Sequence, residues 1–457
     1  MDDKRNRSFI LVITTLSSFI TPFMSSAINI ALPSIGKEFS LNAVILGWIP
    51  TSFLLATAAL LLPMGRLADI YGRTKLFKAG VVIYSISSLL CGTAWSGVAL
   101  ISFRILQGIG GAMLFSTSTA ILVSVFPMNE RGKVLGINTA AVYFGLSSGP
   151  FIGGILTQHL GWRYLFFINV LLGIISFSLA VWKLKTEWVE ARGEKFDLKG
   201  SILFGVTLVS LMYGFSLLPC IYGEYLIIMG LIGLYIFKRF ELKTVSPVFN
   251  MTLLTSNKGF TYSNLAALIN YSATFAVGFL LSFYLQYIKG FNPQTTGFIL
   301  VSQPIIMAVF SPLSGKLSDR TEPRIVASAG MIITTIGLFI LIFLTSQTSV
   351  VSITVSLVFL GFGFAFFSSP NTNAVMSSVD KKYLGVAAST LSTMRITGQM
   401  FSMGLALLIF SLFIGQSKIS YSNSAALLTS IKTAFVIFTI LCAAGIFASL
   451  SRGSLRK

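Results

Sequence analysis

The sequence is poor in charge, histidine and cysteine, and each shortage excludes a class of protein. Only 10% of the 457 residues are charged, 54% are hydrophobic, and the mean hydropathy is +0.84. Soluble proteins carry about a quarter charged residues, so a water-soluble fold is excluded. One histidine, His159, and three widely separated cysteines provide neither a metal site nor a disulfide framework, and we expect no metal and no cofactor.

The chain also lacks the sequence features of nucleic-acid binders, ATP-driven pumps and enzymes. Its formal charge of +19 is not gathered into one domain or stripe, so no nucleic-acid partner is expected. No G-x-x-x-x-G-K-[ST] phosphate loop is present, and no clusters of acids or histidines suggest catalysis. We therefore predict that the protein is not an enzyme.

What the sequence does contain is a series of apolar runs of about 20 residues, the length of an α-helix that crosses a bilayer. The shorter alternating segments of membrane β-barrels are missing. The pattern predicts an all-α polytopic membrane protein in contact with the lipid bilayer. The expected spans cover residues 9–32, 46–68, 76–95, 98–126, 134–157, 163–184, 200–219, 224–240, 261–287, 297–317, 324–345, 350–376, 384–414 and 431–450.

The lysines and arginines predict the orientation of these spans, because cytoplasmic loops carry most of them. With the amino terminus inside, 26 of the 33 fall in loops on that side and five on the other. Only Arg104 and Arg395 stay within spans. We expect a multi-pass protein of the plasma membrane with both termini in the cytoplasm.

An internal repeat divides the chain into two halves. Gly65-Arg-Leu-Ala-Asp69 and Gly315-Lys-Leu-Ser-Asp319 each close the second helix of a half. This spacing predicts two six-helix bundles, at 1–185 and 261–457. The region between them, 186–260, is expected to hold a cytoplasmic linker and two inserted transmembrane helices.

The first copy of the repeat, from Gly65 to Lys75, resembles the loop signature between helices 2 and 3 of the major facilitator superfamily. Gly65 and Gly72 allow helices to approach closely, and Asp69 is spaced to pair with Arg73 across one turn. The resemblance implies that this loop, with Gly315 and Asp319 in the second copy, acts as a latch between the halves during conformational change.

The fourth span carries Arg104-Ile-Leu-Gln107-Gly-Ile-Gly-Gly111, which is similar to the arginine motif of the same superfamily. An arginine within a span costs several kcal/mol unless it faces water or a partner. Arg104 either lines the cavity with Gln107 or extends to the outer interface. We favour the cavity.

The fifth span contains Gly145, Gly149, Pro150, Gly153 and Gly154, and resembles the glycine-proline motif of the antiporter branch. Small residues four apart make a groove for a neighbouring helix, and proline bends the helix. An ordinary helix-packing face would explain the glycines alone. The complete arrangement favours export over uptake.

Two more stretches, from His159 to Asn169 and from Ala31 to Pro33, resemble the fourteen-span drug:proton antiporter family, and the inserted helix pair agrees with it. The resemblance implies a monomer that exports lipophilic small molecules by proton antiport. One departure matters: Met24 stands where that family commonly has an acid, and no acid lies deep in any predicted span. If protons are the coupling ion, the available groups are Asp69 and Asp319.

Uncharged polar residues recur every three or four positions along several spans and so share faces. These faces either line a central cavity or bond their own helix backbone, and we prefer the cavity. The expected substrate-binding residues are Ser25, Asn29, Arg104, Gln107, Phe115, Asn270, Tyr271, Arg395 and Gln399.

The leading functional hypothesis is secondary active export of lipophilic or amphipathic compounds by alternating access. Because the two buried arginines lack an acidic partner, neutral, zwitterionic or anionic substrates are expected over multivalent cations. The alternatives are a lipid or metabolite transporter or flippase of the same fold, a nutrient uptake carrier, and a nontransporting membrane sensor.

Overall fold

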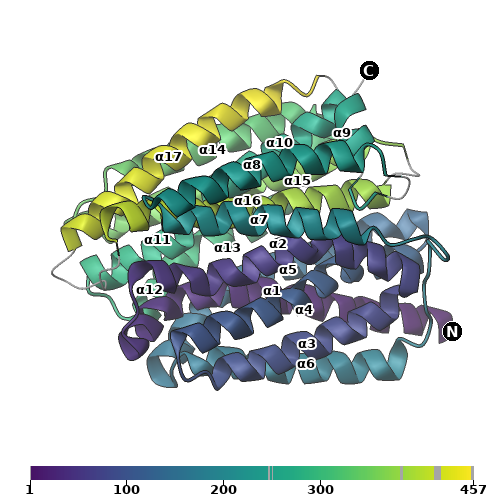
Figure 1. The fold of residues 1–457 in the computed structure, drawn as a ribbon, viewed down its shortest axis with the longest axis horizontal. Coiled ribbons are helices and arrows are strands. Elements are labelled where there is room, and N and C mark those ends of the chain that lie inside the picture. Colours follow the sequence, from purple (N-terminus) through teal and green to yellow (C-terminus); the bar gives the residue numbers. More distant parts are fainter. Residues whose placement is uncertain (1, 245–246, 250, 381–383, 416–423, 454–457) are drawn as a thin grey trace.

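The computed structural model describes residues 2–244, 247–249, 251–380, 384–415 and 424–453, and these residues are almost entirely helical (Figure 1). Alternating helices run in opposite directions through the molecule. Their bounds are α1 Asp2–Phe39, α2 Ala43–Tyr71, α3 Arg73–Gly92, α4 Gly97–Val125, α5 Met128–His159, α6 Arg163–Lys183, α7 Leu198–Leu217, α8 Ile221–Glu241, α9 Met251–Ser256, α10 Lys258–Thr274, α11 Val277–Phe283, the π-helical turn η1 Tyr284–Ile288, α12 Pro293–Leu300, α13 Ser302–Arg320, α14 Pro323–Ile342, α15 Val350–Ser377, α16 Leu384–Phe413 and α17 Ser424–Leu450.

The prediction of 14 transmembrane spans is confirmed. Within the described residues, 14 segments are long and apolar enough to cross a membrane. Two of them are interrupted: α10, α11 and η1 together make the span at Lys258–Ile288, and α12 with α13 makes the span at Pro293–Arg320. The chain is thus a multi-pass membrane protein.

The helices pack into two groups. Helices α1 to α6 form the first bundle, with close contacts between α1 and α5, α2 and α4, and α3 and α4. Helices α10 to α17 form the second bundle, in which α14 and α15, α13 and α15, and α10 and α16 pack together. Figure 1 shows the first bundle in purple and blue beside the second in green and yellow.

The inserted pair, α7 and α8, lies over the seam where the two bundles meet (Figure 1). Helix α7 contacts α2 of the first bundle and α16 of the second, and α8 packs on α7. Glycines bring the pair together: a Cβ on Gly223 would lie 2.8 Å from the carbonyl oxygen of Gly214, and one on Gly230 would lie 2.5 Å from Leu211 Cγ. Small residues give backbones this close approach in a membrane.

The break between α10 and α11 was not expected from the apolar run at 261–287. Helix α10 ends at Thr274, whose hydroxyl donates 2.8 Å to the carbonyl oxygen of Asn270. The N–H of Ala276 donates 3.0 Å to Ser402 Oγ of α16. A neighbouring hydroxyl therefore satisfies a backbone group at the break, which is the condition for an interruption inside a membrane.

Candidate functional site

A cavity of about 130 Å³ lies between the two bundles. It is walled by α1 and α5 of the first bundle and by α10, α12, α13, α15 and α16 of the second. Among the described residues that line it, none is acidic or basic. Its polar lining consists of Ser25, Ser26, Asn29, Thr274, Gln303 and Gln399, and its aromatic lining of Tyr271, Phe275 and Phe364.

One end of the seam, called here the Pro293 end, is closed by direct contacts between the bundles. Ser282 Oγ donates 2.7 Å to the carbonyl oxygen of Asn29, and Gln286 Nε2 donates 3.0 Å to that of Ile30. The imidazole of His159 lies 3.1 Å from Gln294 Oε1. Three contacts between α1 or α5 and the second bundle therefore shut the cavity on this side.

The glycines of α5 allow two helices to approach it from different sides. A Cβ on Gly145 would lie 2.6 Å from the carbonyl oxygen of Phe19, and Gly149 and Gly153 also face α1. Gly154 faces the second bundle instead, because its Cβ would lie 2.7 Å from the carbonyl oxygen of Pro293. The predicted groove is therefore shared between α1 and α12, and Pro150, between its glycines, lines the cavity.

The opposite end of the seam, called here the Asp69 end, is reached through an aromatic cluster. Tyr143, Tyr271 and Phe364 pack together with Met307, and the rings of Tyr271 and Phe364 meet edge to face at 5.3 Å. Tyr143 donates 3.0 Å to Ser368 Oγ across the two bundles. This cluster lies on the Asp69 side of the cavity lining.

Arg395 is the charged side chain beside this cluster. Its Cζ lies 5.8 Å from the centroid of the Tyr271 ring, and Nη2 donates to Thr372 Oγ1. Its buried Nε has no hydrogen-bond partner, and it forms no ion pair with any residue the structure describes. An uncompensated guanidinium therefore borders the cavity without belonging to its lining.

On α1 the polar residues that share one face, called here the stripe, are Thr14, Ser18, Thr21, Ser25 and Asn29. Some of them bond the backbone of their own helix and others line the cavity, the two roles that the sequence left open. The hydroxyls of Thr14, Thr21 and Ser25 donate to carbonyl oxygens of their own helix, at 2.9, 3.3 and 3.0 Å. Only Ser25 and Asn29 of the stripe reach the cavity lining, and Asn29 Oδ1 has no partner among the described residues. Backbone bonding is thus the commoner role in this helix.

Asn270 on α10 is fully buried, yet neither its Oδ1 nor its Nδ2 has a hydrogen-bond partner within the described part of the chain. It precedes Tyr271 of the lining and is not itself part of that lining. Buried polar groups are normally satisfied, so each exception needs a ligand, a water or a function. Of the predicted residues on α10, Tyr271 faces the cavity and Asn270 lies behind it.

Arg104, Gln107 and Phe115 do not reach the cavity, which corrects our expectation for Arg104. Arg104 is 1% exposed; its Nε donates 3.2 Å to the carbonyl oxygen of Ile49, and its Nη1 donates to Gln107 Oε1. Its guanidinium also lies 4.5 Å from the ring centroid of Phe53. These partners inside the first bundle compensate the charge, so it need not face water.

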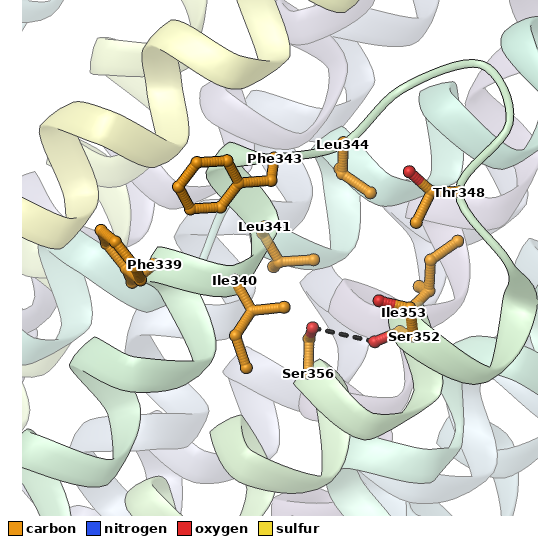
Figure 2. Close-up of a pocket in the computed structure, with 9 residues that line it drawn as sticks. All are labelled: Phe339, Ile340, Leu341, Phe343, Leu344, Thr348, Ser352, Ile353 and Ser356. Carbon is orange, nitrogen blue, oxygen red and sulfur yellow. Dashed lines mark hydrogen bonds between the residues drawn. The ribbon is translucent and has the colours of Figure 1, made fainter.

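A second pocket, of about 170 Å³, lies between the end of α14 and the start of α15 (Figure 2). Figure 2 shows mostly apolar side chains around it, and Phe343 is 63% exposed. The hydroxyl of Ser356 is already used, because it donates 3.0 Å to the carbonyl oxygen of Ser352. This pocket faces away from the seam and offers little polar recognition, so it is not the candidate site.

At the Asp69 end, the signature loop forms a charged network around Arg73. The guanidinium is largely buried; Nε donates 2.9 Å to Asp69 Oδ1, and Nη1 donates 2.6 Å to Ser124 Oγ and 2.7 Å to Glu190 Oε1. Glu190 follows α6, in the linker between the first bundle and α7. The partner of the loop is therefore this linker, where the resemblance implied the opposite half.

The linker segment at residues 184–197, called here the strap, is fastened along the loop by several further bonds. The backbone N–H of Glu190 and of Ala191 donate 3.1 and 2.9 Å to the carbonyl oxygen of Asp69. Glu187 accepts the N–H of Thr74 at 2.8 Å and of Lys75 at 3.2 Å. The carboxylate thus caps the amino terminus of α3, where a negative charge is favourable.

Gly72 makes room for that cap. Its φ is +122°, a conformation that L side chains rarely adopt, and a Cβ there would overlap the Glu187 carboxylate. Gly65 is less crowded, because its nearest neighbour would be Ser116 Cβ at 3.6 Å. Glu187 and Glu190 were not predicted as functional residues, because their only signal in the sequence is a run of acids in a linker.

The second copy of the repeat is built differently. Asn373 Nδ2 of α15 donates 3.2 Å to Asp319 Oδ1 and 3.1 Å to Ser318 Oγ, so α13 is joined to α15. Gly315 faces the same helix, since a Cβ on it would lie 3.0 Å from Ser369 Oγ. Asp319 is therefore held inside the second bundle by a neutral amide.

A 14-span fold of two bundles around a neutral polar cavity defines a membrane transporter. The sequence matches the model of the Major Facilitator Superfamily over residues 14–257 and 264–454, so the chain belongs to that family. The resemblance stated from the loop signature is thereby confirmed.

Three relatives are similar over most of their length. The Riboflavin transporter RibZ of Clostridioides difficile is 33% identical, over 90% of this chain and 89% of that protein. The Multidrug resistance protein Stp of Mycobacterium tuberculosis is 30% identical, over 88% of this chain and 75% of that protein. The Tetracenomycin C resistance and export protein of Streptomyces glaucescens is 27% identical, over 85% and 73%.

Solved structures show the same fold. A bacterial homologue of the human lysosomal transporter Spinster, in an inward-facing and occupied conformation, superposes with a TM-score of 0.66 at 17% identity, covering 98% of this chain and 96% of that one. The xylose transporter XylE of E. coli gives a TM-score of 0.64 at 14% identity, covering 95% and 97%.

Proposed function

We propose that the protein exports lipophilic or amphipathic small molecules across the plasma membrane by alternating access and proton antiport. The cavity carries the proposal: it lies between the two bundles, combines aromatic rings with amides and hydroxyls, and has no charged residue among its described lining. Such a lining suits compounds with a flat apolar body and a few hydrogen-bonding groups. Relatives that bear the names of resistance and export proteins support the direction.

The charges set the substrate class within this proposal. No acid borders the cavity among the described residues, whereas the Arg395 guanidinium lies beside Tyr271 of the lining. A multivalent cation would meet an uncompensated positive charge in a medium of low dielectric constant, where repulsion is strong. Neutral, zwitterionic and anionic compounds are therefore the expected substrates.

The proposed proton coupling uses groups outside the described lining of the cavity. Asp69 and Asp319 lie at the same end of the molecule, and the loop charges support a cytoplasmic position for this end and for both termini. Asp69 is paired with Arg73, and Asp319 accepts from the Asn373 amide. Because Asp69 pairs with the largely buried guanidinium of Arg73, we expect Asp69→Asn to impair turnover.

A second candidate is transport of a neutral planar metabolite, in either direction. The specific observation is the relative named a riboflavin transporter, which is similar over nine tenths of this chain. The aromatic and amide groups of the cavity suit a planar heteroaromatic compound equally well. The two candidates share the site and differ in cargo and direction.

The test is proton movement in energised inverted vesicles, followed with a pH-sensitive dye. Neutral, anionic and cationic lipophilic compounds and riboflavin are added in turn, and vesicles prepared without the protein serve as the inactive reference. Proton release that depends on the compound and on active protein supports antiport. Response to riboflavin alone supports the second candidate, and compound movement without proton movement refutes the coupling.

A further inference from the structure

Two acidic side chains meet at the base of the inserted pair. Asp197 precedes α7, and its Oδ1 accepts the N–H of Gly200 at 2.9 Å. Glu241 ends α8 and is only 2% exposed, and its Oε2 accepts the N–H of Phe249 at 2.9 Å. A Cβ on Gly200 would overlap Asp197 Oδ2 and would lie 2.5 Å from Glu241 Oε1. Both oxygens therefore lie on the same side of Gly200, close to its Cα.

The two facing oxygens, Asp197 Oδ2 and Glu241 Oε1, are both buried and have no hydrogen-bond partner in the described part of the chain. Neither residue forms an ion pair there. Of the described charged groups on the elements packed around Glu241, the carboxyl of Asp197 is the one that acts on it, and it lies within hydrogen-bonding reach. Within the described ranges of the chain, no cation balances the pair.

Such a pair is costly when both carboxyls are ionised, because two like charges then face each other away from water. A single proton between Oδ2 and Oε1 removes the repulsion and gives each oxygen a partner. The other two oxygens, Asp197 Oδ1 and Glu241 Oε2, accept backbone N–H groups, so Oδ2 and Oε1 are the oxygens left for a shared proton.

We propose that Asp197 and Glu241 form a proton-binding site, which holds one proton between Asp197 Oδ2 and Glu241 Oε1. The site joins the start of α7 and the end of α8 to Phe249, on the segment that leads into the second bundle. When the proton leaves, the two carboxylates repel and this junction loosens. The site is separate from the cavity and does not depend on the proposed cargo or direction.

The consequence for stability has a definite sign. In the unfolded chain both carboxyls ionise at about pH 4, whereas the folded pair keeps one proton to higher pH. The folded state then binds more protons, so stability falls as pH rises until the pair loses its proton. One proton changes the ratio of folded to unfolded protein by at most about tenfold per pH unit.

The experiment compares the full-length protein in detergent with Glu241→Gln and Asp197→Asn across a pH series. Both substitutions are conservative: Asn still caps α7, and Gln still accepts from Phe249 while its amide replaces the shared proton. The control is Glu224→Gln, an exposed acid in the first turn of α8. Thermal unfolding is measured together with the infrared carbonyl stretch of a protonated carboxylic acid.

We expect wild type and the control to lose stability as pH rises above about 4, with the acid band disappearing over the range in which stability falls. Both test variants should lack this band and this pH dependence, and Glu241→Gln should be the more stable protein at alkaline pH. Equal pH dependence in all four proteins, without an acid band in wild type, would overturn the proposal. So would stabilisation by sodium at fixed pH that the two test variants abolish, since a cation would then occupy the site.

Discussion

Gly72→Ala is expected to release the strap from the signature loop. The new methyl group has to enter the space of the Glu187 carboxylate, and the residue has to keep a φ of +122°. The backbone strain is worth about 1–3 kcal/mol. Loss of the two charge-assisted bonds from Thr74 and Lys75 to Glu187 adds about 1.5–3 kcal/mol, so the total is about 3 kcal/mol or more.

An energy of about 3 kcal/mol corresponds to roughly a hundredfold change in the opening equilibrium of the strap. Limited trypsin digestion measures it, because Arg192 and Lys195 lie exposed on the strap and cleavage follows the open population when reclosing is fast. We expect cleavage at these sites to accelerate by up to about a hundredfold. Glu187→Gln, which keeps one acceptor oxygen and loses the charge and the second acceptor, should show a smaller acceleration.

The matched control is Gly161→Ala. Gly161 also has a positive φ, +98°, but a Cβ there meets no atom within 4 Å and lies at the Pro293 end. Gly161→Ala therefore reproduces the backbone strain of a positive φ without a steric clash. If Gly72→Ala and Gly161→Ala digest at the same rate as wild type at the strap, the cap at Glu187 does not hold the loop and the reasoning fails.

Three further predictions concern the cavity and its closure. Asn29→Leu should reduce transport at least about tenfold at unchanged expression, because a polar cavity group is lost; export equal to wild type would remove Asn29 from the site. Arg395→Gln should lower transport of anions more than of neutral compounds, and a uniform loss would assign Arg395 to structure. Gly297→Ala should abolish transport and lower the unfolding temperature, because its Cβ would overlap the carbonyl oxygen of Pro150, whereas Gly136→Ala, with no atom within 4 Å, should do neither.

The architecture was predictable because the bilayer imposes few solutions. A span needs about 20 apolar residues, and the sequence provides 14 such runs. The number of spans therefore followed from the pattern of apolar runs alone. The ends were less predictable. The described part of α17 starts at Ser424, ahead of the apolar run that begins near 431, and it includes hydroxyls that bond the helix backbone, as Ser430 Oγ does to the carbonyl oxygen of Ala426.

The site was predictable only in part. The spacing of polar residues shows which of them share one face of a helix, but it does not show which other helix packs against that face. Ser25, Asn29, Tyr271 and Gln399 lie on polar faces and do line the cavity. Arg104 lies on a face that packs inside the first bundle, where a backbone carbonyl and an aromatic ring satisfy it. Which helix covers a face depends on tertiary packing, and the sequence of one helix does not contain that information.

The linker was the least predictable region, because its acids act through long-range contacts. Glu187 and Glu190 are separated from the loop they hold by more than a hundred residues. Composition identified this stretch only as polar. Helix α6 brings the linker back to the end of α2, and this places the acids beside the loop. A local sequence pattern does not encode such a contact.

The inserted pair is attached to both bundles, and this constrains any rocking motion between them. At the Asp69 end, the strap fastens the chain before α7 to the loop of the first bundle through Glu187 and Glu190. At the Pro293 end, Ser411 of α16 donates to the carbonyl oxygen of Leu218, just after α7. Several charge-assisted bonds hold the first attachment, whereas the second combines a neutral hydrogen bond, worth about 1 kcal/mol, with apolar packing such as that of Phe215 on Phe401. When the bundles move apart at the Pro293 end, the weaker attachment yields, so the pair is expected to travel with the first bundle and to slide along α16.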